Sequence, residues 1–295
     1  MVRNLWIALV AVTICAGVWA GNGAAEQPVA PESDLTLDLV ALVDDAARLV
    51  TETGSAAACK EFREPGPWFQ GESYIFILDM AGNMVCNPSS PELEGQNLLD
   101  LKDPLGKPIA QNILREVQGS STEGWTHYLW PRPEFMTSFW KTSYFKKVTD
   151  PDGKQVVVAS GLYEIEMERF FVVEQVDDAV SLIQEQGEEA FDTLRDPASG
   201  FIFYDAYVFV MEETGEMLVN VGFPELEGKN LIDLEDVDGK PFVREMLERL
   251  AGAESAWVDY RWPRPGKTPT SDKTSYVRRL ELDGRTLVVG AGVYF

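Results

Sequence analysis

The sequence predicts an α+β fold of two tandem units, each a long N-terminal helix followed by an antiparallel sheet of about five strands, with a short helix and loop over the sheet. Three observations predict this. The chain repeats itself over almost its whole length, each half opens on an apolar stripe at helical spacing, and short β-rich segments separated by glycine turns follow each stripe. With 295 residues, the chain is long enough for two cores of ordinary size.

The duplication keeps its register through the chain. Three motifs recur 133 residues further on: VDDA at 43–46, PELEG-x-NL at 91–98 and GKP at 106–108. The paired motifs WPRP and KTSY of residues 130–144 recur 132 residues on, and the G-x-Y of 161–163 recurs 131 residues on. The offset between the copies thus shrinks by one residue only twice, which indicates one ancestral domain copied in tandem. A solenoid would need more and shorter repeats. We expect the units at residues 34–165 and 166–295.

Each unit begins with a predicted helix. Residues of one face step by three and four from Leu39 to Thr53 and from Val173 to Leu194. Such a stripe indicates packing on the unit's own core, and a homodimer through these N-terminal helices is the alternative. A hairpin follows, because the β-rich segments 74–79 and 207–212 lead through glycine turns into MVCN and MLVN.

The remaining elements repeat in the same order. The stretch NLLDLKDPLGKP indicates a loop that leads into a helix at 109–118, and its copy does the same. Asp103, Asp236 and Asp238 in these loops lack the dense oxygen pattern of calcium loops, so we interpret them as turn formers. Three strands close each unit, at 125–130, 142–148 and 155–163 in the first and at 257–262, 274–280 and 286–294 in the second.

Residues 1–25 indicate an export signal. One arginine precedes the apolar run 5–20, and small residues then offer cleavage after Ala20 or Ala25. The run is short for a membrane span, which needs about 20 apolar residues, and an uncleaved anchor is the alternative. The sequence continues past the second G-x-Y only as Phe295. We therefore expect a soluble periplasmic or otherwise extracytoplasmic protein that signals through a separate membrane partner.

Charge and cysteine content narrow the class of partner. A net charge of −23 argues against nucleic acid and anionic membrane surfaces. After export, Cys59 and Cys86 could form a disulfide, and two buried free thiols are the alternative. Two cysteines and the single histidine, His127, are too few for a metal site of soft ligands, so we expect neither metal nor cofactor. Because His127 alternates with Tyr128 along a strand, we expect it on the surface.

With these motifs assembled, both units resemble Cache domains, specifically the single-Cache type 2 pattern. The resemblance depends on Y-x-F-x-x-[DE]-x-x-G, the PELEG-to-GKP stretch, Y-x-W-P-x-P…K-x-S-Y and the terminal G-x-Y, and it covers nearly all of the chain beyond the signal. It implies a PAS-like sheet with a small-ligand pocket beneath the overlying loops. Cache domains commonly recognise short organic acids and serve chemoreceptors, histidine kinases or cyclases. Where the family often has His-Pro after the hairpin, this chain has Asn87-Pro88 and Asn220-Val221, which puts the role of that position in doubt.

The repeated signature supplies the candidate binding residues. Alternation in a strand places Tyr128 with Trp130 on one face, and a rigid Pro-x-Pro exit holds this apolar wall. A lysine cation and tyrosine hydroxyls above the wall could hold a carboxylate. The candidates are Tyr74, Tyr128, Trp130, Lys141 and Tyr144 in the first unit and Tyr207, Tyr260, Trp262, Lys273 and Tyr276 in the second, where we expect binding first. Arg132 and Arg264 between the prolines are expected to face solvent or a loop carboxylate.

The function expected from these residues is binding without covalent chemistry. Neither a nucleophile–histidine arrangement present in both copies nor a phosphate-binding loop appears in the sequence, so we expect no catalytic residues. The leading hypothesis is an exported sensor or solute-binding protein for a short-chain organic acid that works with a transmembrane receptor or kinase. The alternative is a docking protein whose pockets are filled by their own side chains.

Overall fold

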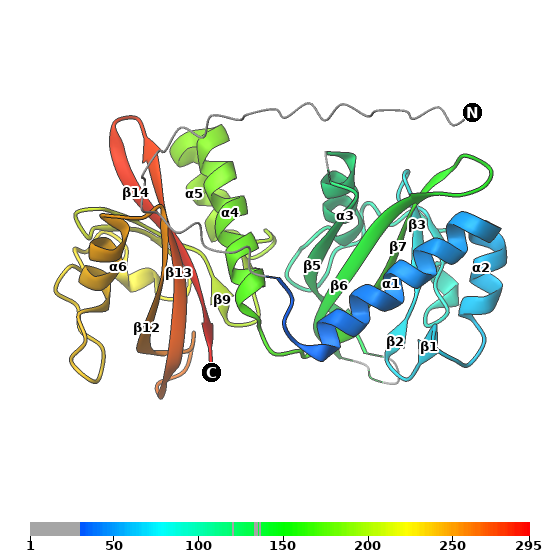
Figure 1. The fold of residues 1–295 in the computed structure, drawn as a ribbon, viewed down its shortest axis with the longest axis horizontal. Helices are drawn as coiled ribbons and strands as arrows, with labels where there is room; N and C mark the ends of the chain where they lie inside the picture. The colour runs from blue at the N-terminus through cyan, green and yellow to red at the C-terminus, as the bar shows by residue number, and fades with distance from the viewer. Residues whose placement is uncertain (1–29, 120, 133–134, 136) are drawn as a thin grey trace, which may run out of the picture.

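A computed structural model describes residues 30–119, 121–132, 135 and 137–295 and shows two α+β units side by side (Figure 1). The predicted export signal and both cleavage positions lie outside the described residues. Each unit contains a five-stranded antiparallel sheet with the same strand order, in which the hairpin forms one edge and the last strand lies in the middle. The predicted α+β architecture is therefore confirmed.

The first unit opens on two helices, α1 (Asp34–Thr53) and α2 (Ser55–Phe62), separated by Gly54 at a φ of 87°. Its sheet has the order β4-β3-β7-β6-β5. The elements are β1 (Phe69–Gln70), β2 (Ser73–Tyr74), β3 (Phe76–Asp79), β4 (Met84–Cys86), η1 (Pro91–Leu93), α3 (Ile109–Gln118), β5 (Glu123–Pro131), β6 (Ser138–Thr149) and β7 (Gln155–Tyr163).

The second unit repeats this order in a sheet β11-β10-β14-β13-β12. Its helices are α4 (Arg169–Gln186), η2 (Gly187–Glu189), α5 (Ala190–Arg195), η3 (Pro224–Leu226) and α6 (Phe242–Leu250). Its strands are β8 (Ile202–Phe203), β9 (Ala206–Tyr207), β10 (Phe209–Glu212), β11 (Met217–Asn220), β12 (Ser255–Pro263), β13 (Thr270–Leu282) and β14 (Arg285–Tyr294).

The long helices pack on their own sheets. The face of α1 that contacts β6 and β7 is buried at Leu39, Val43, Ala46 and Val50. The predicted stripe from Leu39 to Thr53 shares Leu39 and Ala46 with this face, but its Leu42 and Leu49 are half-buried and Thr53 is exposed. The α4 helix lies on β13 and β14 in the same way. These faces form part of each unit's core, and a homodimer through them stays a prediction. The α3 and α6 helices cover the opposite face of each sheet, so each sheet lies between two helical layers.

The sequence located most elements but missed several breaks. The predicted helix at 109–118 coincides with α3, and the six closing strands lie where they were predicted. The stripe from Val173 to Leu194 was wrongly predicted as one helix, because Gly187 at a φ of 65° ends α4, and η2 and α5 follow as separate elements. The helices α2 and α5 and the short hairpins β1-β2 and β8-β9 were not predicted.

The two units meet through an aromatic cluster, with α4 standing between the two sheets (Figure 1). Phe170, Phe171 and Phe203 of the second unit pack against Trp125 and Trp140 of the first. At the start of α1, the Glu168 carboxylate accepts hydrogen bonds from the Ser33 and Thr36 hydroxyls at 2.7 Å. No helix among the residues described is both long and apolar enough to cross a bilayer.

Candidate functional site

Strand register builds the same polar row in both units. In the first, Lys141 lies opposite Tyr128 on one neighbouring strand and opposite Tyr163 on the other. In the second, Lys273 lies between Tyr260 and Tyr294. Directly paired residues of an antiparallel sheet point to one face, so each lysine is flanked by two tyrosines. The Tyr of G-x-Y was not among the predicted site residues, although its exact repetition was the available signal.

The Lys141 side chain is buried without a hydrogen-bond partner. Its exposed fraction is 0%, and no described residue accepts a hydrogen bond from Nζ. The ammonium lies 3.9 Å from the ring centre of Tyr74 and 4.9 Å from that of Tyr163. Burial acts to raise the pKa of Tyr74, and the nearby Lys141 charge is the largest of the effects that lower it, with a net lowering. An ammonium held by ring faces alone is electrostatically suited to an anion.

Lys273 occupies the equivalent place with one difference. Its Nζ donates to the Tyr207 hydroxyl at 3.1 Å and lies 4.6 Å from the ring centre of Tyr294. Burial lowers the pKa of Lys273 to about 7, against an opposing effect of Asp205. The second lysine is therefore partnered, and it loses its proton more readily than an exposed lysine does.

The glycine of each G-x-Y leaves room for the lysine stem. A Cβ placed on Gly161 would lie 2.7 Å from Lys141 Cε, and one placed on Gly292 would lie 2.5 Å from Lys273 Cε. The tyrosine hydroxyls of the same motifs donate to the Pro131 and Pro263 carbonyls at 2.8 and 2.9 Å. Each G-x-Y thus positions the lysine and ties the last strand to the Trp-Pro strand end.

Each arginine of W-P-R-P forms an ion pair with a loop carboxylate, which was one of the two predicted alternatives. Arg132 pairs with Glu72 at 2.5 Å, and Arg264 pairs with Asp205. The Arg264 guanidinium also lies 5.0 Å from the ring centre of Tyr294. The arginine and the lysine therefore face the same tyrosine ring, which closes the outer end of the row.

A small apolar cavity adjoins each row. Each has a volume of about 30 Å³, room for roughly two water-sized positions. Tyr74, Tyr128 and Trp130 line the first cavity from the sheet, and residues of α3 such as Ile113 close it from above. Tyr207, Tyr260, Trp262 and Lys273 line the second beneath α6.

A buried asparagine that the sequence left in doubt borders each cavity. Asn87 is 2% exposed, and its Oδ1 accepts from the Ser90 backbone at 2.9 Å, which leaves the Nδ2 group of this amide for a ligand. The Glu94 carboxylate accepts from the Asn87 backbone N–H at 2.9 Å and pairs with Arg63. The second unit repeats this arrangement with Asn220, Glu227 and Arg195. The repeated PELEG motif was the signal for this positioning carboxylate.

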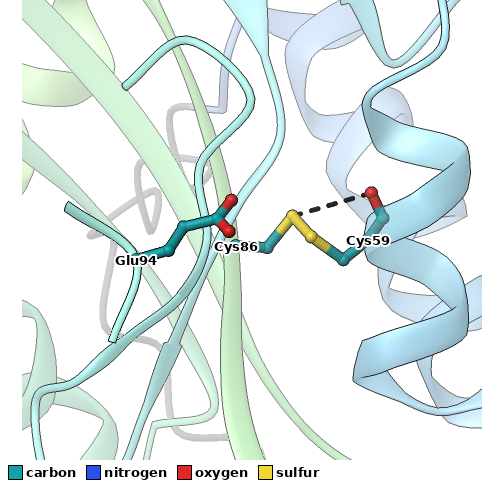
Figure 2. Close-up of side chains that lie close together, drawn as sticks. All are labelled: Cys59, Cys86 and Glu94. Atoms are coloured by element: carbon teal, nitrogen blue, oxygen red, sulfur yellow. Dashed lines mark hydrogen bonds between the residues drawn. A yellow bond between two sulfur atoms is a disulfide. The ribbon is translucent and has the colours of Figure 1, made fainter. Parts of the chain in front are cut away.

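The first unit adds a disulfide beside this asparagine. Cys59 of α2 and Cys86 of β4 are bonded, with Cα atoms 5.8 Å apart, so the structure contains the disulfide rather than two free thiols. Figure 2 shows the Glu94 carboxylate next to the pair. Because both sulfur atoms are bonded to each other, neither is a thiolate that could bind a metal.

Two predicted site residues do not belong to the row. Tyr144 and Tyr276 pack in the core under α1 and α4, against Trp125 and Trp257. The physical reason is strand alternation, because residues three apart in a strand point to opposite faces. Their placement beside Lys141 and Lys273 was therefore wrong.

The prediction of a surface His127 was also wrong. The ring stacks on Phe203 of the second unit at 4.0 Å between centres, and Nδ1 lies 2.9 Å from the Thr142 hydroxyl. Burial, and then the Lys107 charge, lower the pKa of His127 to about 3. Lys107, missed in the sequence, is 1% exposed and donates to the His127 and Ile202 carbonyls, so it joins the two units.

The loop carboxylates form turns, as expected. Asp103 accepts from the backbone N–H groups of Leu105, Lys107 and Leu129, and Asp236 does the same for Asp238, Lys240 and Arg261. These bonds fasten each loop to the strand that carries the Tyr and Trp of the cavity.

Two family models and several known proteins match this chain. The family model described as Single Cache domain 2 matches residues 172–295, and a model described as Cache domain matches residues 49–171. The methyl-accepting chemotaxis protein McpP of Pseudomonas putida is 30% identical over 91 residues, covering 31% of this chain and 16% of the relative. The sensor histidine kinase MctS of Rhizobium johnstonii is 34% identical over 90 residues, covering 30% and 19%.

A solved Cache chemosensory domain, studied for its recognition of carboxylic acids, is 27% identical, covering 45% of this chain and all of that domain with a TM-score of 0.38. The matched region is less than a fifth of the length of either curated relative. Two family models in succession cover residues 49–295, and they do so over the two repeated units. The chain therefore belongs to the Cache family and carries two Cache domains in tandem.

Proposed function

We propose that this chain is an exported sensor protein whose Cache cavities bind a short-chain carboxylate and that it acts with a separate membrane signalling partner. The observation that carries the proposal is the buried Lys141 ammonium, which no described residue hydrogen-bonds. An isolated buried cation is unfavourable, and a bound anion would supply the missing charge and acceptors. McpP and MctS, a chemotaxis protein and a sensor kinase, support sensing rather than catalysis.

The cavity limits the size of the ligand. A volume of about 30 Å³ between Tyr74, Trp130 and Ile113 suits an acid of about two or three carbons. Lys141 does not itself line this cavity, but its Nζ lies 3.9 Å from the ring centre of Tyr74, which does. In the proposed pose, the Asn87 amide and the Lys141 charge would orient the carboxylate, and the carbon tail would lie on Tyr128 and Trp130. Because Lys273 already donates to Tyr207, we propose tighter binding in the first unit. This reverses the sequence-based expectation that the second unit binds first.

The experiment is calorimetric titration of the exported, purified protein with acetate, propionate, pyruvate and longer acids. Lys141→Met should abolish binding at the first cavity, whereas Lys154→Met, at an exposed position, should leave it unchanged. A ligand at 100 times its Kd should stabilise the protein by about 2.7 kcal/mol. Equal binding by both variants would overturn the proposed site. Absence of any hit would favour the docking-protein alternative, for which the internal Lys273–Tyr207 bond is the supporting observation.

A further inference from the structure

A groove between the two units lies apart from both lysine cavities. It has a volume of about 840 Å³ and runs between α3 of the first unit and α4 of the second. Glu116 enters from α3, and Glu174 and Asp178 enter from α4, one helical turn apart. None of these three carboxylates takes part in an ion pair with a described residue.

The arrangement sets like charges against each other. Partial loss of hydration, followed by the charges of Asp178 and Glu174, raises the pKa of Glu116 to about 8 although this residue is exposed to the groove, and Arg115 opposes this only in part. Glu174 and Asp178 are likewise exposed, and partial loss of hydration, followed by the charges of Asp178 and Asp177, raises the pKa of Glu174 to about 7. Gly124 of β5 makes room for the Glu116 carboxylate, which a side chain at that position would strike. Carboxylates of both units are thus held together in a way that a bound cation would relieve.

The side chain of Gln175 borders the same groove. Its side chain is 4% exposed, and Nε2 donates to the Phe201 carbonyl at 2.8 Å, which fixes the amide's orientation. Its Oε1 has no hydrogen-bond partner among the described residues. A buried acceptor left without a donor is unfavourable by about 1–3 kcal/mol. The groove is therefore lined by three exposed carboxyl groups and by Gln175, whose buried amide oxygen lacks a donor among the described residues. A ligand that suits this lining must donate hydrogen bonds.

The spacing favours an extended organic cation over a metal ion. A metal needs its oxygen ligands within about 5 Å of one another, and these carboxylates do not form such a group in the part of the chain that is described. Acidic residues line the groove along α4 from Glu174 to Glu185, a rise of about 16 Å at 1.5 Å per residue. Lys107 is engaged by two carbonyls, and Lys102 and Arg115 border the groove on the first unit, opposite α4.

We propose that this groove binds a linear aliphatic polyamine whose ammonium groups bridge Glu116 of the first unit to Glu174, Gln175 and Asp178 of the second. The polyamine lies along α4 and links the two units. The groove is separate from the lysine cavities, so a carboxylate bound in a cavity does not displace the polyamine.

The test is calorimetric titration of the whole exported protein with spermidine at low salt, with MgCl2 in a parallel titration. We expect one saturable spermidine site. The triple variant Glu116→Gln, Glu174→Gln, Asp178→Asn should bind at least tenfold more weakly. A matched variant, Glu213→Gln, Glu216→Gln, Glu235→Gln, removes three carboxyl groups from exposed positions outside the groove and should bind as the unaltered protein does.

Two further variants test the site without removing its acids. Ser181→Lys places a cation into the groove from an exposed position and should abolish spermidine binding. Gln175→Met keeps the charge and should weaken binding several-fold, with circular dichroism confirming the fold. Equal weakening in the matched control would show attraction by net charge alone and overturn the proposal. Mg²⁺ binding of comparable strength at the same residues, or no saturable site, would overturn it as well.

Discussion

Replacing Lys141 with methionine should make the protein more stable while it loses its ligand. Methionine has nearly the same length and shape, so the core keeps its packing. The change removes an ammonium that is 0% exposed and has no hydrogen-bond partner among the residues described. Stability and binding then change in opposite directions, which an ordinary core substitution does not do.

The expected change in the free energy of unfolding follows from two opposing contributions at Lys141. Loss of hydration disfavours a buried ion by several kcal/mol. Contact with the rings of Tyr74 and Tyr163, at 3.9 and 4.9 Å, restores about 1–2 kcal/mol of this. The net gain in the free energy of unfolding should be about 1–3 kcal/mol, a rise in Tm of several degrees for a unit of this size.

The assay is urea unfolding of the unliganded protein, followed by calorimetric titration with the carboxylate that binds best. Lys154→Met serves as the surface control and should change neither quantity. A loss of more than 1 kcal/mol in Lys141→Met would refute the reasoning, since it would mean that the ammonium is satisfied in the unliganded protein. The equivalent change at Lys273 should stabilise less, because Tyr207 already accepts its hydrogen bond.

Four further outcomes are expected. Lys107→Met should lower stability by about 2 kcal/mol, because two buried carbonyls of different units lose a charged donor, whereas Lys102→Met at the exposed neighbouring position should not, as thermal unfolding would show. Glu94→Gln should weaken ligand binding in the first cavity several-fold with little change in Tm, and Glu227→Gln should leave that cavity unaffected; titration of both variants decides this. Replacing Cys59 and Cys86 with serine should reduce stability by about 3 kcal/mol, as measured by urea unfolding under oxidising conditions, and a reducing agent should then change nothing further. The affinity of the second cavity for carboxylates should fall about tenfold per pH unit above pH 7, as Lys273 loses its proton. The pKa of Lys273 is lower in the folded protein than in the unfolded chain, so the unfolded chain binds more protons between about pH 7 and 10.4. The stability of the protein relative to Lys273→Met should therefore rise across that pH range.

Local patterns in the sequence were sufficient for the fold. The repeat at 131–133 residues, the helix at 109–118 and the six closing strands depend on periodicity and turn residues, which act over short distances. The break at Gly187 was missed because the apolar steps continue through it, and only the backbone conformation, with a φ of 65°, shows that the helix ends there. Short pairings such as β8-β9 carry too few residues for a periodic signal.

The candidate site, like the fold, could be predicted from the sequence only in part. The sequence by itself determined that a lysine, two aromatic residues and a G-x-Y are repeated, because identical spacing in two copies is visible without a structure. Only the tertiary structure decided which of these side chains share a face: register between three strands sets Lys141 beside Tyr163 and sends Tyr144 to the opposite core. It also decided what His127 and Lys107 do, since their partners Phe203 and Ile202 belong to the other unit. Such contacts between distant residues depend on how whole elements pack, and no short-range pattern encodes them.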